Sequence, residues 1–186
     1  DLPEGCLLLL DEAYIEFAPE GTAAAIDADD PRVIKMRTFS KAYGMAGARI
    51  GYAIGARGLI RSFDKIRNHF GMNRMAQAGA LAAFGDAAWL LHVQGEVARA
   101  RDRIALIAQE NGLRALPSAT NFVAVDCGAD GAFASAVLEA LVARGVFVRK
   151  PFVAPQDRCI RISCGRPQDL DVLAEVLPEA LSAARG

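Results

Sequence analysis

The chain of 186 residues carries a formal net charge of −1 at pH 7, and 53% of its residues are hydrophobic. This balance excludes the broad electrostatic attraction to nucleic acid or membranes that a strongly basic chain would have. It also excludes a disordered polypeptide. We therefore expect a packed globular protein whose partners are small molecules or other protein subunits.

The cysteines show no pattern of a disulfide or metal site. They form no CxxC pair, and neither histidine lies near them in the sequence, so we expect reduced, structural thiols at Cys6, Cys127, Cys159 and Cys164. No charged and apolar leader precedes the first apolar run, which is too short to cross a membrane. We therefore expect a cytoplasmic protein.

The first elements predict a sheet that carries acidic and basic residues at one edge. The run "CLLLLDEAY" at residues 6–14 is typical of a strand buried on both faces, which places Asp11 near its carboxyl end. "RVIKMRTFS" and "ARIGYAIG" predict two further strands, joined by the turn "KAYGMAG". Since ligands bind at the carboxyl ends of such strands, Asp11 and the Ser40–Lys41 pair are expected at one crevice.

The middle of the chain is predicted to be helical. Residues 59–68 form one helical pattern, and residues 75–110 form two helices or one long bent helix, which "NGL" at 111–113 ends. The order then changes to strand "TNFVAVDC", helix 131–144, strands "VFVRK" and "CIRISCG", and a last helix beginning at Pro167. This pattern predicts a separate α+β unit, with a domain boundary near Gly85 that divides residues 1–85 from residues 86–186.

The stretch "TFSKAYGMAGARIGY" at residues 38–52 contains groups that suit an aldehyde cofactor with a phosphate. A lysine amine captures the aldehyde of pyridoxal phosphate as a Schiff base, so Lys41 is the candidate. The Ser40 hydroxyl and the Arg49 guanidinium are suited to the phosphate, and Gly44 and Gly47 allow the backbone to turn tightly. An isolated Ser–Lys pair is nonetheless more often a solvated surface feature.

Asp11 strengthens the hypothesis, because a carboxylate at the end of a buried strand is costly without a partner. A protonated pyridine nitrogen would be such a partner. The ion pair would keep the ring cationic, as the electron sink that chemistry at the α-carbon of an amino acid requires.

"DEAYIEF" followed by "TFSKAYGMAGARIGY" resembles the fold-type I aminotransferases that depend on pyridoxal phosphate, and most closely the class II histidinol-phosphate aminotransferase branch. The resemblance continues through "PSATNFVAV" and "CIRISCG". It implies an α/β fold, with part of a large domain that has a mixed, mostly parallel sheet, and a C-terminal α+β small domain. Family members are roughly twice this length, so the resemblance implies the C-terminal half of the family fold.

The resemblance also implies roles for the residues of the first unit. Lys41 would form the Schiff base and then act as the acid and base of the proton shift. Asp11 would pair with the pyridine nitrogen, and Tyr14 would hydrogen-bond the phenolic oxygen of the cofactor; Ser40 and Arg49 would bind its phosphate. A half-buried aromatic at a strand end is an equally good interpretation of Tyr14 from the residues alone.

Three residues of the second unit resemble substrate-binding positions of the family. Arg161 resembles the arginine that clamps the substrate α-carboxylate, Asn121 lies near that clamp, and Arg149 corresponds to an arginine near the distal phosphate of histidinol phosphate. An outward strand arginine and a strand-start asparagine remain open for Arg161 and Asn121, and Phe152 is equally consistent with an aromatic substrate. We interpret the remaining basic residues of the first unit as solvated charges: Lys35, Arg37 and Arg57.

The sequence thus predicts an aminotransferase of histidine biosynthesis, with histidinol phosphate and 2-oxoglutarate as the favoured substrates. The resemblance also implies a homodimer. An aromatic amino acid aminotransferase or a phospho-amino-acid decarboxylase remains open within the family. A different class also remains open, namely an inactive fragment that only binds a ligand or a partner chain. A sheet without its leading strands is expected to expose edges and apolar faces.

Overall fold

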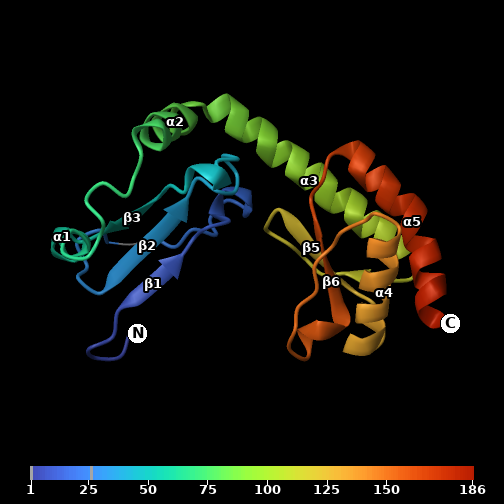
Figure 1. Cartoon of the computed structure of the whole chain (residues 1–186). Coiled ribbons are helices and arrows are strands. Elements are labelled where there is room, and N and C mark those ends of the chain that lie inside the picture. Colours follow the sequence, from blue (N-terminus) through green and yellow to red (C-terminus); the bar gives the residue numbers. More distant parts are fainter. Residues whose placement is uncertain (1, 26) are drawn as a thin grey trace. The chain divides into compact units, whose positions relative to one another are not determined.

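The computed structural model describes residues 2–25 and 27–186, and Figure 1 shows the order of their helices and strands. Contacts along the chain divide it into two units, separated between Gln94 and Gly95. This division falls within a helix rather than at Gly85. The assignment of residues 86–94 to the second domain therefore stays a prediction.

The first unit contains a three-stranded mixed sheet in the order β1–β2–β3. Strand β1 (Leu8–Asp11) runs parallel to β2 (Val33–Thr38), which runs antiparallel to β3 (Gly51–Gly55). The predicted strands and the mixed sheet are confirmed. Because β1 and β2 are parallel, Asp11 and the residues that follow Thr38 lie at the same edge of the sheet.

Strand β1 is exposed, which contradicts the prediction that it is buried on both faces. The side chains of Leu8 and Leu9 are 36% and 61% exposed, and Asp11 is also exposed. A continuous apolar run predicts covering layers on both sides of a strand. Within the described part of the first unit, the packed core instead lies beside β3, around Phe39 and Ile50.

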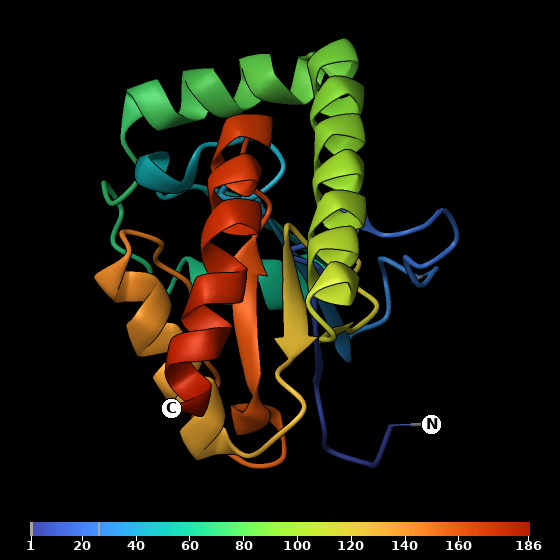
Figure 2. The same ribbon diagram turned by 90° about the vertical axis from the view of Figure 1, so that its right-hand side faces the viewer.

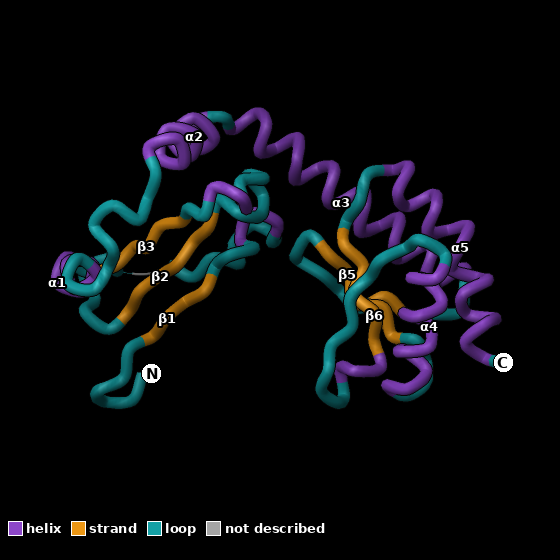
Figure 3. The backbone as a smooth tube through the Cα atoms, in the orientation of Figure 1, coloured by secondary structure: helices purple, strands orange, loops and turns teal. Residues whose placement is uncertain are grey.

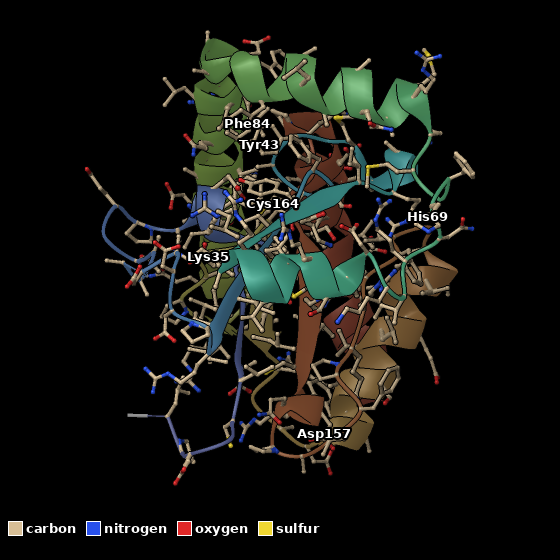
Figure 4. All side chains as sticks on the ribbon, turned by 90° about the vertical axis from the view of Figure 1, so that its left-hand side faces the viewer. Lys35, Tyr43, His69, Phe84, Asp157 and Cys164 are labelled. Atoms are coloured by element: carbon tan, nitrogen blue, oxygen red, sulfur yellow. The ribbon has the colours of Figure 1, made fainter. Side chains whose placement is uncertain are left out.

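Two helices follow β3. Helix α1 (Arg57–Phe63) is shorter than the predicted segment 59–68. Helix α2 (Arg74–Gly85) is capped by the preceding residue, Asn73, whose side chain accepts a hydrogen bond from the Ala76 amide at 2.7 Å. Ala76 and Ala80 of α2 are buried against Phe39 and Ile50. Tyr43 and Phe84, labelled in Figure 4, both pack on the Phe39 ring, with centroids 4.8 and 6.4 Å away.

Helix α3 (Ala87–Glu110) follows α2 after Asp86, so the predicted long helical region is two helices. The carboxylate of Asp86 accepts a hydrogen bond from the Trp89 amide at 2.9 Å, which satisfies a free donor in the first turn. The helix ends before Gly112, whose φ of 70° suits the predicted stop.

The second unit contains an antiparallel sheet of strands β4 (Arg114–Ala115), β5 (Phe122–Asp126) and β6 (Cys159–Ser163), shown in orange in Figure 3. Strands β5 and β6 confirm the prediction, whereas β4 was not predicted. The predicted strand "VFVRK" is wrong, because this segment forms only an isolated bridge between Arg149 and Arg161. Its β-branched and aromatic residues suit a strand, but a single bridge gives it no continuous hydrogen-bonded partner.

Helices cover one face of this second sheet. Helix α4 (Gly131–Ala143), helix α5 (Pro167–Arg185) and the later part of α3 pack on alternate residues of β5 and β6. Figure 2 looks onto these helices, with β5 and β6 behind them. The core between them is fully buried at Leu141, Ile160 and Leu177. This arrangement confirms the predicted α+β unit and the last helix beginning at Pro167.

In the described part of the chain, no helix is both long and apolar enough to cross a membrane. Burial raises the pKa of the Cys127 and Cys164 thiols to about 11, so both are protonated at neutral pH. No disulfide joins the described cysteines.

The core of the second unit leads to a stability prediction. Leu177 on α5 is 0% exposed, whereas Val172 on the same helix is 48% exposed. Leu177→Ala should lower the free energy of unfolding by about 2–5 kcal/mol, because it removes buried methyl groups and leaves a cavity. The control Val172→Ala should change it by about 0.5 kcal/mol or less. Urea unfolding followed by circular dichroism measures both, and equal losses would contradict the assigned core.

A buried carboxylate gives this unit a pH-dependent stability. The Asp126 side chain is 8% exposed and accepts hydrogen bonds from Arg114 Nη2 at 3.1 Å, Arg158 Nε at 2.9 Å and the Gly128 amide at 2.9 Å. Burial alone would raise the pKa of Asp126, but the Gly128 amide and the two guanidinium groups hold this pKa below its ordinary value.

Asp126→Asn should therefore destabilise the second unit at pH 7 by about 1 kcal/mol, a modest amount because both arginines are partly solvated. A carboxyl whose pKa is lowered by folding contributes stability above its unfolded pKa of about 3.9, and this contribution is lost as the pH falls through the folded value. The loss of unfolding free energy in Asp126→Asn, relative to the wild type, should accordingly shrink below about pH 4. Urea unfolding at pH 7 and pH 3 tests this, and a deficit that stays constant with pH would refute it.

Candidate active site

The carboxyl ends of β1 and β2 bring Tyr14 and Lys41 together. The Lys41 Nζ lies 5.1 Å from the centroid of the Tyr14 ring. Tyr14 directly precedes a short 3₁₀ helix (Ile15–Phe17) that follows β1, and Lys41 follows the end of β2. Two predicted site residues that are distant in sequence thus lie side by side.

Lys41 and Ser40 are fixed by the buried residue before them. The Phe39 amide donates to the Ile50 carbonyl at 3.2 Å, and the Phe39 carbonyl accepts from the Met45 amide at 2.9 Å. The Ser40 amide donates to Thr38 Oγ1 at 3.0 Å. With Phe39 held in an aromatic core, Ser40 and Lys41 follow as half-buried residues at the edge of the sheet.

The turn after Lys41 requires a glycine at one of its two predicted positions. The Gly44 amide donates to the Lys41 carbonyl at 2.9 Å, and Gly44 has a φ of 69°, which a residue with a side chain rarely adopts. Gly47 does not have a positive φ, and a Cβ there would meet open space. Gly44 is therefore the residue that the tight turn requires.

Arg49 occupies a strained backbone conformation. It ends the 3₁₀ helix Ala46–Ala48 with φ 52° and ψ 49°, and it is the one residue other than glycine with a positive φ in the described part of the chain. Its Nη1 donates to the Ala46 carbonyl at 2.8 Å, and the residue is exposed. Because such strain is found at ligand sites more often than elsewhere, it favours a binding role for the guanidinium.

Asp11 lies at the predicted strand end but in a different environment from the one expected. Its Oδ1 accepts the Ala13 amide at 2.9 Å, and the residue is exposed rather than buried. Asp11 therefore does not bear the cost of a buried carboxylate. The assignment of Asp11 rests on its place at the end of β1, beside the residues that lead to Tyr14.

The neighbouring residue Glu12, which the sequence analysis did not single out, is buried among charges. Its Oε1 lies 3.0 Å from Lys35 Nζ and its Oε2 lies 2.9 Å from Arg37 Nε, with side-chain exposures of 5%, 7% and 26%. The interpretation of Lys35 and Arg37 as solvated charges is therefore wrong, whereas Arg57 is exposed. Alternation along β2 was the available signal, because two basic residues two positions apart share one face.

In the second unit, the bridge between residues 149 and 161 brings two arginines together. The Arg149 amide donates to the Arg161 carbonyl at 3.1 Å, and the Arg161 amide donates back at 2.6 Å. Both arginines line a groove of about 610 Å³, together with Lys150, Phe147 and Phe152. Like charges directly opposite each other in a β-bridge repel, so this groove is suited to an anion.

A ring supports one of these arginines. The Arg161 Cζ lies 4.5 Å from the centroid of the Phe122 ring, a cation–π distance. Asn121 lies beside Phe122 at the start of β5, and its carbonyl accepts the Cys164 amide at 2.9 Å. Asn121 is not one of the residues that line the groove. The geometry of the second unit thus groups Arg149 with Arg161, and it adds Phe122 and Lys150, which the sequence analysis did not propose.

In the part of the chain that the structure describes, no three His, Cys, Asp or Glu side chains gather as metal ligands do. The chemical groups present are instead an amine beside an aromatic ring, a carboxylate at a strand end, and guanidinium groups. These groups suit an organic cofactor and substrates that carry negative charge.

Comparison with known proteins agrees with this set of groups. Residues 2–177 match the family described as aminotransferase class I and II. A histidinol-phosphate aminotransferase from Jannaschia sp. is 39% identical over 170 residues, which cover 90% of this chain and 47% of the relative. An aromatic amino acid aminotransferase from Mycobacteroides abscessus is 35% identical over 173 residues.

A solved structure gives the same result for the fold. The histidinol-phosphate aminotransferase from Sinorhizobium meliloti, in complex with pyridoxal-5'-phosphate, is 52% identical and superposes with a TM-score of 0.95 over 97% of this chain and 50% of that chain. The expected partial fold-type I architecture is confirmed, and the chain spans about half the length of the relatives it matches. The chain belongs to the aminotransferase class I and II family.

Proposed function

We propose that this chain carries the lysine-bearing part of a pyridoxal-phosphate-dependent aminotransferase, and that its reaction is amino transfer between histidinol phosphate and 2-oxoglutarate in histidine biosynthesis. The observation that carries the proposal is the 52% identity, over 97% of this chain, to a histidinol-phosphate aminotransferase crystallised with pyridoxal-5'-phosphate. The relative from Jannaschia sp. has the same name.

The residues of the first unit fit the cofactor. When bound, pyridoxal phosphate supplies an aldehyde and an electron-withdrawing ring. In our proposal the Lys41 amine would hold the cofactor through its aldehyde carbon and would later move the proton at the substrate α-carbon. The Asp11 carboxylate binds the ring nitrogen, and the Tyr14 hydroxyl binds the phenolic oxygen. The 5.1 Å between Lys41 Nζ and the Tyr14 ring supports these adjacent roles.

The phosphate of the cofactor is assigned to Ser40 and Arg49. The Ser40 hydroxyl is adjacent to Lys41 in sequence, and the exposed Arg49 guanidinium keeps donors beyond the Nη1 that binds Ala46. A planar guanidinium binds a phosphate with parallel hydrogen bonds, which favours arginine over lysine at such a site.

The substrate is assigned to the groove of the second unit. Arg161 binds the α-carboxylate, and Arg149 binds the distal phosphate of histidinol phosphate, with Asn121 near the carboxylate. The pairing of Arg149 and Arg161 in one bridge, beside Lys150, supports a substrate with more than one negative charge.

An aromatic amino acid is the second candidate substrate. Phe147 and Phe152 line the same groove and are 77% and 94% exposed, so they offer apolar surface to a ring. The aromatic amino acid aminotransferase that is 35% identical to this chain supports this alternative.

The proposal also includes a cytoplasmic location and a homodimer. Size-exclusion chromatography with light scattering tests the dimer.

Covalent capture of the cofactor tests the role of Lys41. Treatment of the chain with pyridoxal phosphate and then borohydride should label Lys41 in preference to exposed Lys65, because Lys41 lies among the groups that bind the cofactor. Lys41→Ala should abolish this label. It should also abolish the absorption band near the visible edge that a Schiff base between the lysine and pyridoxal phosphate gives. Peptide mass spectrometry measures the labelled positions, and equal labelling of Lys41 and Lys65 would count against the proposed cofactor site.

Removal of the guanidinium at position 149 tests the substrate. In the enzyme that carries this sequence, Arg149→Ala should lower kcat/KM for histidinol phosphate by about 10–100-fold, since a charged hydrogen bond contributes about 1.5–3 kcal/mol. The same variant should change kcat/KM for phenylalanine little, and this substrate is the matched control. A larger loss with phenylalanine, or high wild-type turnover of phenylalanine without turnover of histidinol phosphate, would favour the aromatic alternative.

A further inference from the structure

The Glu12 carboxylate forms the most buried ion cluster in the described part of the first unit. Its side chain is 5% exposed, and its two oxygens bind different cations, Lys35 at 3.0 Å and Arg37 at 2.9 Å. Charges removed from water in this way are costly unless each has a partner, so the geometry of the cluster is strongly constrained.

This cluster joins the residue that follows β1 to two positions of β2. The Glu12 amide donates to the Met36 carbonyl at 2.9 Å, which extends the β1–β2 ladder by one residue beyond Asp11. Arg37 is paired with Tyr52 of β3 in the antiparallel register. Lys35, labelled in Figure 4, also donates from Nζ to the Ala24 carbonyl at 2.7 Å, which ties down the loop between β1 and β2.

Glu12 and Asp11 lie on opposite faces of the sheet, so Glu12 does not contact the proposed cofactor site from the face that Asp11 occupies. Successive side chains of a strand point to opposite faces, so Glu12 faces away from Asp11. The same alternation places Lys35 and Arg37 on one face of β2 and Met36 on the other. Any effect of Glu12 on the site must therefore pass through the position of the backbone.

Apolar side chains add little burial along β1 itself, although the 3₁₀ helix that follows is anchored by buried Phe17 and by the hydrogen bond from Gln94 Nε2 to the Glu16 carbonyl. The strand has only four residues and pairs with β2, and its Leu8 and Leu9 side chains are 36% and 61% exposed. Backbone bonds in so short a ladder leave the register weakly specified, because a slip is not opposed by apolar burial. An ion cluster that bridges two positions of β2 adds a constraint on this register.

We propose that Glu12 is a positioning residue: by binding Lys35 and Arg37 together, it holds the end of β1 against β2 so that Tyr14 faces Lys41. The consequence for cofactor capture rests on the proposed function, whereas the placement of Tyr14 does not. Glu12 touches neither substrate nor cofactor in this role.

The experiment compares Glu12→Gln with a matched control in the cofactor-free chain. Asp126→Asn is the control, because Asp126 is an equally buried carboxylate with two cationic partners, Arg114 and Arg158, in the second unit. The primary readout is the nuclear Overhauser contact between the Lys41 side chain and the Tyr14 ring. We expect this contact to be lost in Glu12→Gln and to be kept in Asp126→Asn.

The second readout is covalent capture of pyridoxal phosphate, trapped with borohydride. The ratio of label at Lys41 to label at Lys65 should fall about tenfold or more in Glu12→Gln, because misplacement by about 1 Å costs a reaction up to about 10²-fold. The ratio should be unchanged in Asp126→Asn. Circular dichroism, recorded under the same conditions, confirms that each variant is folded.

A second variant covers the case in which Glu12→Gln does not fold because Lys35 is left buried without its partner. Glu12→Gln combined with Lys35→Met removes that charge, and we expect it to fold but still to lose the Tyr14–Lys41 contact. A wild-type contact in either folded variant would overturn the proposal. If wild-type Lys41 shows the Tyr14 contact but no selective capture, the proposed function fails, and the role of Glu12 is still decided by the contact.

Discussion

The first unit depends on an electrostatic constraint, the carboxylate of Glu12 held between Lys35 and Arg37. It lies where β1 ends, and Tyr14, Ser40 and Lys41 follow within a few residues of that end and of the end of β2. Phe39 provides a second, apolar anchor on the other chain segment, through its contacts with Tyr43 and Tyr52. A charged anchor on one strand and an aromatic anchor on its neighbour together place Tyr14 beside Lys41.

Most elements were predictable from local pattern. The starts of the last two helices, the stop at Gly112 and the strands around Val123 and Ile160 all follow from periodicity, proline and glycine signals. These signals are local, so they do not depend on what packs above a strand. The prediction for "VFVRK" failed because composition alone cannot say whether a strand-like segment has a hydrogen-bonded neighbour.

Burial was less predictable than secondary structure. An apolar run such as residues 6–10 predicts a strand with other elements packed on both faces. The run itself does not say which elements those are. For Lys35 the error was the reverse, because it was predicted to be solvated but is buried. A lysine on a strand is normally solvated unless an acid distant in sequence pairs with it. Glu12 was adjacent to a predicted site residue, yet only the register between β1 and β2 shows that its side chain meets Lys35 and Arg37. Motifs named the candidate site residues, whose roles stay predictions, whereas the structure was needed to group Arg149 with Arg161 in one groove that Asn121 does not line.

The backbone of Arg49 bears on the balance between folding and binding. A left-handed conformation disfavours any residue with a Cβ by roughly 1–2 kcal/mol, and glycine would adopt it without this penalty. Arg49→Gly would thus be a plausible thermostabilising change to an engineer who considered the backbone alone. The same change would delete the guanidinium that we assign to an anion. Consensus-style stabilisation of this protein should therefore leave position 49 untouched, because there the chain sacrifices some stability of its fold for a chemical group.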